Sequence, residues 1–296
     1  KIKFKIMFYL WDVVPHPTRF LKKARQKTFS FAYGSDSLFY KRGDITMVHF
    51  VGAGCGAADL ITVRGQNLLK NADIVIYTGS LVNKELLSIT KKDCKIYNSA
   101  YMTLEQITTI FTENSQKEIV RLHTGDPCLY GAIREQMDIL NEKGICYDIC
   151  PGVSSFCGAA AELQMEYTLP NVSQTVIITR VEGKTPVPKN EDISKLAQHN
   201  ATMVIFLSAR LLETLEQKLK QGGCRDDMPV AIVQKATWQD QKIVRCTVST
   251  LSQCAKQHNI TKTALIIVGD VLGSDYERSL LYHPTFSTEF RKAEKT

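Results

Sequence analysis

Strand-like and helix-like segments alternate along most of the chain, and this alternation limits the possible folds more than any other feature. Short apolar runs precede amphipathic stretches with helix caps; Thr103-Leu-Glu-Gln106, for example, is a capping box before an apolar stripe. Such a pattern predicts a mostly parallel sheet with right-handed crossovers. The first five strands are expected near residues 48–51, 73–77, 94–97, 118–123 and 146–150.

A second sheet-forming half follows an alanine-rich helix predicted over 156–163. No helix pattern separates the third and fourth strands of this half, which indicates an antiparallel hairpin and a mixed sheet. We therefore expect an α/β protein with an N-terminal domain over 47–166, a C-terminal domain over 167–274 and a tail over 275–296. The strands of the second half are expected at 175–180, 203–207, 230–233, 242–247 and 264–268.

The segment over 121–132, Arg-Leu-His-Thr-Gly-Asp-Pro-Cys-Leu-Tyr-Gly-Ala, is the predicted centre of the molecule. Pro127 cannot donate to a sheet ladder and biases Asp126 away from helical geometry, while Gly125 and Gly131 permit angles that side chains forbid. We expect a bent loop at the carboxyl end of a strand, with a helix restarting at Gly131. Open α/β sheets bind ligands at that edge, although an ordinary strand-to-helix turn would give the same pattern.

The net charge of +7 belongs entirely to the N-terminal extension. Residues 1–46 hold ten of the 37 Lys and Arg residues and three of the 30 Asp and Glu residues, so the other 250 residues carry 27 of each sign. Basic residues interleaved with aromatic ones suit a nucleic-acid arm or an interfacial segment. The simpler interpretation is a leader outside the fold, with Met47 as the natural start, and we predict neither a nucleic-acid nor a membrane partner.

The nine cysteines, an odd number with no Cys-x-x-Cys pair, are typical of reduced thiols in a cytoplasmic protein. The six histidines are far apart in sequence, and we predict no metal site. His123 borders the central loop, where a hydrogen-bonded structural role is favoured over a catalytic one. With neither a Gly-x-Ser-x-Gly elbow nor a base near Cys55 or Cys128 in the sequence, the chain is predicted to bind a cofactor that does the chemistry.

A glycine-rich turn, Gly52-Ala-Gly-Cys-Gly56, joins the first predicted strand to a helix predicted over 59–69. The turn invites a dinucleotide-binding interpretation, but Ala57 stands where the helix-packing glycine should be. The second predicted strand also ends without the acidic residue that binds ribose. A nicotinamide-dependent oxidoreductase is therefore a disfavoured alternative.

Several of these motifs together resemble those of the tetrapyrrole methylases, most closely the branch that methylates C-11 of precorrin-4 or cobalt-precorrin-4 in cobalamin synthesis. The resemblance covers nearly all of residues 47–273. Ser173-Gln-Thr-Val-Ile177 and Gly183-Lys-Thr-Pro-Val-Pro188 are typical of this branch. The motifs shared with the wider family are the glycine turn with 59–65, Tyr77–Val82, Leu122–Pro127, Leu129–Ala132, Pro151–Ser155 and Lys235–Trp238.

The resemblance implies two α/β domains with S-adenosylmethionine bound in a cleft between them, and a homodimer. It also implies backbone and side-chain contacts to the cofactor from both halves of the chain. Asp126 would place a negative charge near the sulfonium or the amino group. The implied cofactor-binding residues are Thr124, Gly125, Asp126, Leu129, Ser154, Ser155, Leu207, Ala236 and Ala264.

The substrate implied by the resemblance is a polycarboxylate corrin precursor, which calls for basic side chains near the cleft. No catalytic base is identified. Tyr130 and Glu135 flank the central loop as substrate-orienting candidates, and each basic candidate could equally be a solvated charge. The basic candidates are Arg64, Arg180, Lys184, Lys235 and Arg245.

The glycine turn departs from the family pattern Gly-Ala-Gly-Pro-Gly-Asp-Pro. Cys55, Ala57 and Ala58 replace the first proline, the aspartate and the second proline. Losing two rigid residues predicts a more mobile loop. Other branches remain alternatives: a C-17 or C-20 corrin methylase, a uroporphyrinogen III methyltransferase or a diphthine synthase.

Overall fold

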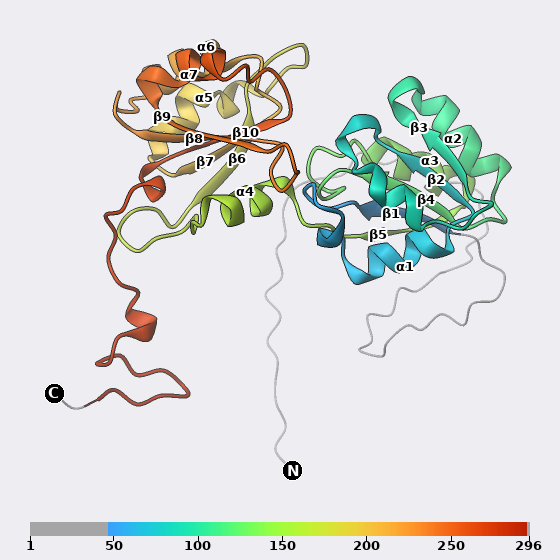
Figure 1. Cartoon of the computed structure of the whole chain (residues 1–296), viewed down its shortest axis with the longest axis horizontal. Coiled ribbons are helices and arrows are strands. Elements are labelled where there is room, and N and C mark those ends of the chain that lie inside the picture. The colour runs from blue at the N-terminus through green and yellow to red at the C-terminus, as the bar shows by residue number, and fades with distance from the viewer. Residues whose placement is uncertain (1–46, 295–296) are drawn as a thin grey trace, which may run out of the picture. The chain divides into compact units, whose positions relative to one another are not determined.

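The computed structural model describes residues 47–294, which form two five-stranded sheets (Figure 1). The predicted basic extension over 1–46 lies outside the described residues. All ten predicted strands are present. None of the helices within 47–294 is both long and apolar enough to cross a membrane.

The first sheet is entirely parallel, in the order β3-β2-β4-β1-β5. Helix α1 (Val63–Asn71) packs on one face through Leu69, and α2 (Leu104–Glu113) and α3 (Arg134–Lys143) pack on the other (Figure 1). All five strands therefore end at the same edge. They are β1 (Met47–Gly52), β2 (Ile74–Tyr77), β3 (Lys95–Asn98), β4 (Ile119–His123) and β5 (Cys146–Cys150).

The second sheet is mixed, in the order β6-β7-β10-β8-β9, and contains the predicted antiparallel β8–β9 hairpin. Helices α5 (Ile193–Leu196), α6 (Leu212–Gln221) and α7 (Leu251–Gln257) cover one face, and α4 (Ser155–Leu163) covers the other (Figure 1). The strands are β6 (Val176–Arg180), β7 (Thr202–Phe206), β8 (Pro229–Gln234), β9 (Lys242–Thr247) and β10 (Ala264–Val268).

Helix α4 packs with the second sheet, although the predicted boundary at residue 166 assigns it to the first domain. Ala159 and Leu163 lie in one core cluster with Val204 and Phe206 of β7. The small side chains of this helix allow a close approach to the strands. By packing, the division between the two layers therefore precedes Ser155, while the domain limits themselves remain a prediction.

Two helices begin later than the sequence pattern predicts. The helix expected from residue 59 begins at Val63, because the Thr62 hydroxyl accepts a hydrogen bond from the Gly65 N–H at 3.1 Å and caps it there. The helix expected from Gly131 begins at Arg134, since Ala132 has a left-handed φ of 49° that no α-helix accommodates. Both shifts lengthen the loops at the carboxyl edge.

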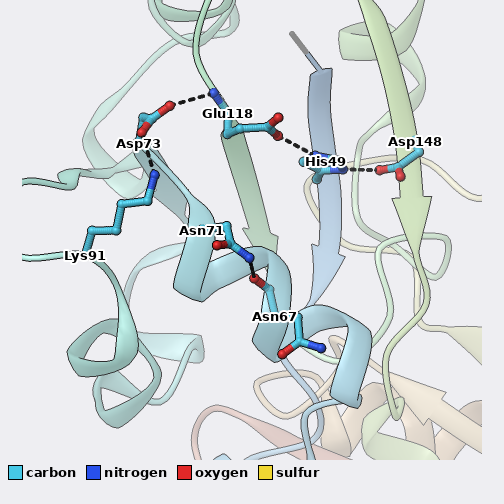
Figure 2. A network of polar contacts seen from close by, with 7 residues as sticks. All are labelled: His49, Asn67, Asn71, Asp73, Lys91, Glu118 and Asp148. Atoms are coloured by element: carbon cyan, nitrogen blue, oxygen red, sulfur yellow. Dashed lines mark hydrogen bonds and ion pairs between the residues drawn. The ribbon is translucent and has the colours of Figure 1, made fainter. Parts of the chain in front are cut away.

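A polar network spans the strands near their amino ends, away from that edge (Figure 2). His49 of β1 lies between two carboxylates, with Nδ1 2.6 Å from Asp148 and Nε2 3.0 Å from Glu118. Asp73 accepts a hydrogen bond from the Glu118 N–H and pairs with Lys91 at 2.8 Å. These contacts tie the amino ends of β2, β4, β1 and β5 together.

Candidate functional site

Three glycines from three different loops meet at the carboxyl edge of the first sheet. A Cβ on Gly52 would lie 2.5 Å from the carbonyl oxygen of Gly125, and one on Gly152 would lie 2.1 Å from the same oxygen. Both distances are shorter than any normal contact, so only glycine fits at either position. The loops after β1, β4 and β5 thus approach one another backbone to backbone.

Hydrogen bonds fix this meeting point. The N–H of Gly125 donates to the Gly54 carbonyl at 2.8 Å, and the reverse bond measures 3.3 Å. Asp126 accepts hydrogen bonds from the N–H groups of Cys128 at 2.8 Å and Gly152 at 2.9 Å. Its carboxylate therefore braces two loops, a structural role that the sequence did not predict.

The carboxyl edge also brings together predicted cofactor contacts from the first half of the chain. Thr124 follows β4, and its hydroxyl lies 3.4 Å from that of Thr78 after β2. Ser154 is buried and precedes the first turn of α4, which begins at Ser155. The Ser154 hydroxyl caps none of the helix N–H groups, and the N–H groups of Ser155 and Phe156 have no acceptor within residues 47–294, so this helix start offers two donors suited to an anionic group.

Three predicted contacts from the second half meet at one edge of the second sheet. Strand β10 runs antiparallel to β7 with Ile266 opposite Ile205, so the start of β10, which carries Ala264, lies at the same edge as the end of β7, which Leu207 follows. Ala264 pairs with Gln234 of β8, two residues before Ala236. Leu207 is 69% exposed although apolar, while Ala236 and Ala264 are buried.

Left-handed backbone conformations concentrate in these loops. Among residues 47–294, ten residues other than glycine have positive φ, and six of them lie beside the predicted contacts. Each costs about 1–3 kcal/mol, and such strain gathers at binding and catalytic sites. The six are Tyr130 (57°), Ala132 (49°), Leu207 (53°), Lys235 (52°), Thr237 (67°) and Thr263 (53°).

The central loop touches the second sheet directly. The Tyr130 ring lies 5.4 Å from the Phe206 ring at the end of β7, and Leu129 packs against the cluster on the α4 face. Burial raises the pKa of the Tyr130 phenol, an effect that exceeds the opposing influence of Arg180. Tyr130 is thus neutral and lies within electrostatic reach of the end of β6.

The basic candidates do not all gather at these edges. Arg180 ends β6, and its guanidinium donates to the carbonyl oxygens of Thr185 at 3.2 Å and Pro186 at 2.6 Å. Lys235 pairs with Asp240 and is thereby neutralised. Arg245 lies in the middle of β9 and donates to the Leu163 carbonyl at 3.3 Å, away from the edge.

The other three orienting candidates are exposed. Arg64 lies in the first turn of α1 and Glu135 in the first turn of α3, both near the carboxyl edge. Lys184 lies in the loop that follows β6. We therefore retain Arg180 and Tyr130 as the candidates with defined surroundings.

His123 is buried, and its Nε2 has no hydrogen-bond partner among the described residues. Burial lowers its pKa to about 3, with a smaller contribution from Arg121. The neutral ring packs 6.0 Å from the Phe50 ring. This differs from the hydrogen-bonded histidine expected from the sequence and gives no support for catalysis.

Within 47–294, no group of three His, Cys, Asp or Glu side chains is placed to hold a metal ion.

The altered glycine turn is held by neighbours that the sequence analysis missed. Asn83 donates to the Gly56 carbonyl at 3.1 Å, and Thr237 bonds to both Cys55 and Ala57. Thr237 and Ala57 are 180 positions apart, so no local pattern could pair them. The predicted extra mobility of this turn stays a prediction, but a side-chain contact now stands at Cys55, where the family has its first proline.

Comparison with known proteins gives the family. The sequence model of the tetrapyrrole (corrin/porphyrin) methylases matches residues 47–252. This chain belongs to the tetrapyrrole methylase family. The match begins at Met47, where the first described strand also begins, and does not include the basic extension.

Individual tetrapyrrole methylases are similar over most of this chain. A cobalt-precorrin-4 C(11)-methyltransferase of Methanocaldococcus jannaschii is 50% identical over 251 residues, which cover 84% of this chain and 97% of the relative. A protein of the same name from Priestia megaterium is 43% identical, covering 84% and 99%. A precorrin-4 C(11)-methyltransferase of Mycobacterium tuberculosis is 42% identical, covering 79% and 95%.

Solved structures of tetrapyrrole methylases share the fold. The X-ray structure of a cobalt precorrin-4 methyltransferase matches with a TM-score of 0.76 and 42% identity, covering 77% of this chain and 96% of that one. The uroporphyrin-III C-methyltransferase of Thermus thermophilus, solved with S-adenosylhomocysteine, matches with a TM-score of 0.65 at 22% identity, covering 76% and 93%. At that identity the second match shows the fold alone. The predicted fold class is thereby confirmed.

Proposed function

We propose that this chain is an S-adenosylmethionine-dependent methyltransferase that methylates C-11 of cobalt-precorrin-4, or of metal-free precorrin-4, in cobalamin biosynthesis. The observation that carries this proposal is the 50% identity, over 97% of its length, to a protein named cobalt-precorrin-4 C(11)-methyltransferase. The corresponding figure for a uroporphyrinogen-III C-methyltransferase of Bacillus subtilis is 32% over 48% of its length. The C-11 branch is therefore favoured over that alternative.

The residues at the carboxyl edge of the first sheet, and those at the edge of the second sheet that carries Leu207, Ala236 and Ala264, fit S-adenosylmethionine. Close backbone approach at Gly52, Gly125 and Gly152 leaves main-chain groups, not side chains, to face a ligand. The free N–H groups at the start of α4, beside Ser154, suit the carboxylate of its methionine moiety. When bound, the cofactor supplies a methyl group activated by the positive charge on sulfur.

The chain's own contribution is to bind, to orient and to exclude water. We assign cofactor contacts to Thr124, Gly125, Asp126 and Leu129 on the first half of the chain. Asp126 would do so chiefly by bracing the loop, because both of its oxygens already accept hydrogen bonds. The remaining assigned contacts are Ser154, Ser155, Leu207, Ala236 and Ala264.

Arg180 and Tyr130 are proposed to orient the substrate. Arg180 forms no ion pair within residues 47–294 and donates only to carbonyl oxygens, so its positive charge is not cancelled by a carboxylate. An uncancelled guanidinium is the group expected to bind an acidic side chain of the macrocycle. Tyr130 offers a neutral phenol and an aromatic face beside it. Arg64, Lys184 and Glu135 have exposed positions suited to weaker contacts.

The decisive experiment is methyl transfer in vitro. Purified protein is incubated with S-adenosylmethionine and cobalt-precorrin-4, metal-free precorrin-4 or uroporphyrinogen III, and products are analysed by mass spectrometry and by NMR with a ¹³C-labelled methyl group. We expect one methyl group at C-11 of the precorrin-4 substrates and none on uroporphyrinogen III. Methylation at another carbon would assign the chain to a different branch, and the ratio of the two precorrin rates identifies the natural substrate.

We further propose that the enzyme acts as a homodimer in the cytoplasm. The odd number of cysteines without Cys-x-x-Cys pairing supports a reducing compartment. Light scattering of the purified protein gives the mass of the assembly directly. A monomeric mass at micromolar concentration would contradict the dimer, and export of the protein would contradict the location.

A further inference from the structure

The loop between β8 and β9 packs tightly against the glycine turn. A Cβ on Gly56 would lie 2.3 Å from Cδ1 of Trp238 and 2.6 Å from the carbonyl oxygen of Ala236. Residues from the two sheets are thus in backbone contact at this point. The binding of any ligand that contacts both edges therefore depends on the geometry of this contact.

Thr237 joins the two segments through a single hydroxyl group. Its Oγ1 accepts a hydrogen bond from the Ala57 N–H at 3.0 Å and donates one to Sγ of Cys55 at 3.5 Å. Cys55 is only 4% exposed, and burial raises the pKa of its thiol, which keeps the sulfur protonated and the contact uncharged. The methyl group of Thr237 also packs near Gly158 of α4, 3.1 Å from where a Cβ would lie.

The backbone of Thr237 is strained and is held in place by further contacts. Its φ is +67°, an unfavourable value for a β-branched residue. Its N–H donates to Oε1 of Gln241 at 2.7 Å, and Nε2 of Gln241 donates to Glu162 of α4 at 2.6 Å. The hydroxyl is therefore fixed in one position by a chain of bonds that ends on α4, the helix whose start carries Ser154 and Ser155.

We infer that Thr237 is a positioning residue that sets the glycine turn against the Ala236 end of the cofactor site. Cys55 supplies the sulfur acceptor at the position where the family pattern has a proline, which has no side-chain acceptor. This turn therefore lacks the rigid proline ring at that position and has instead the Cys55–Thr237 hydrogen bond, which joins the two halves of the chain. This inference rests on the proposed function, because the readout is binding of the cofactor product.

Calorimetric titration with S-adenosylhomocysteine tests this role on the full-length protein. Thr237→Val removes both hydrogen bonds at nearly constant volume and is expected to weaken binding about tenfold. Thr237→Ser keeps the hydroxyl and should stay within about twofold of the wild type. Cys55→Ala removes only the sulfur acceptor and should weaken binding by about threefold.

Thr202→Val is the matched control, because Thr202 is a buried threonine whose hydroxyl donates to the Tyr167 carbonyl at 2.9 Å, outside both loops. It should lower the melting temperature as Thr237→Val does, yet bind normally. Wild-type affinity in Thr237→Val, or equal loss in Thr202→Val, would overturn the role of Thr237. No binding by the folded wild type would instead overturn the proposed function itself.

Discussion

The carboxylate of Asp126 accepts a hydrogen bond from the backbone N–H of Gly152 at 2.9 Å, joining the loops that follow β4 and β5. These strands are not neighbours, because β1 lies between them in the sheet. The bond therefore closes the carboxyl edge over β1 and its glycine turn. An aspartate carried by a proline-rigid loop is well suited to hold such a bridge.

Replacing Gly152 by alanine should destabilise the protein by about 3 kcal/mol, because the added Cβ would lie 2.1 Å from the Gly125 carbonyl oxygen. Chemical denaturation followed by circular dichroism measures this change. Gly183→Ala is the control: among residues 47–294 its Cβ would meet only the flexible Cδ1 of Leu211, at 3.3 Å, so it should change stability by less than about 0.5 kcal/mol. Equal stability of the two variants would show that the backbones are not in contact.

Stability should fall at alkaline pH through His49. Burial disfavours its charged form, but the hydrogen bonds and charges of Asp148 and Glu118 outweigh burial and raise its pKa above 6.5. A raised pKa in the folded state contributes stability that is fully present below pH 6.5 and is lost as the pH rises through the folded value. His49→Gln should remove this component, so the wild type and the variant should differ in the slope of unfolding free energy with pH.

The opposite result of the pH measurement would contradict this role of His49. If the free energies of the wild type and His49→Gln run parallel from pH 6 to pH 9, His49 is not protonated between its two carboxylates. Glu118→Gln offers a second test, since it removes one of the two charges and should reduce the slope only in part.

His123 should limit stability on the acid side. Burial lowers its pKa to about 3. As the pH falls below 6.5, His123 therefore becomes protonated in the unfolded chain but stays neutral in the folded chain. Its contribution is fully present above pH 6.5 and is lost as the pH falls toward 3. His123→Leu should therefore move the midpoint of acid unfolding to lower pH, as followed by circular dichroism. A midpoint that rises or stays fixed would mean that the ring is accessible to protons.

Substrate recognition should depend on the shape and hydrogen bonds of the Arg180 guanidinium group as well as on its positive charge. Arg180→Lys keeps a positive charge but cannot bond to both the Thr185 and Pro186 carbonyls, so KM for the corrin precursor should rise about tenfold. Arg180→Gln should raise it further, while the affinity for S-adenosylhomocysteine stays unchanged. Arg134→Gln, an exposed arginine paired with Asp138 on α3, is the control. A loss of cofactor affinity in the Arg180 variants would move this residue out of the substrate role.

Much of the fold could be predicted because the local signals agree with the tertiary structure. Buried strands such as β2 and β10 are continuous apolar runs, and both bonds of the Thr103 and Gln106 capping box form as expected. Gly144 ends α3 in a left-handed conformation, which is the usual position of glycine at a helix end. Parallel pairing then brings the loops after β1, β4 and β5 to one edge without further information.

The rest depends on contacts between distant parts of the chain, which no local pattern contains. Arg121 is buried within β4, where it donates to the Ile76 carbonyl and to Gln136, although a strand pattern alone would place an apolar residue there. Helix α4 packs on the second sheet because Ala159 and Leu163 fit against β7. Thr237 lies in the family motif Lys235–Trp238, yet its bond to the glycine turn is visible only in the structure.

The most direct test of the proposed cofactor site is calorimetric titration of the folded protein with S-adenosylhomocysteine, alongside NAD, for the wild type, Asp126→Ala and Asp138→Ala. We predict micromolar binding by the wild type and by Asp138→Ala, because the exposed Asp138 carboxylate pairs with Arg134 alone among residues 47–294. Asp126→Ala loses both loop-bracing hydrogen bonds and should bind at least about tenfold more weakly, and NAD should not bind. A folded wild type that ignores S-adenosylhomocysteine or prefers NAD would contradict the assignment of this site to S-adenosylmethionine.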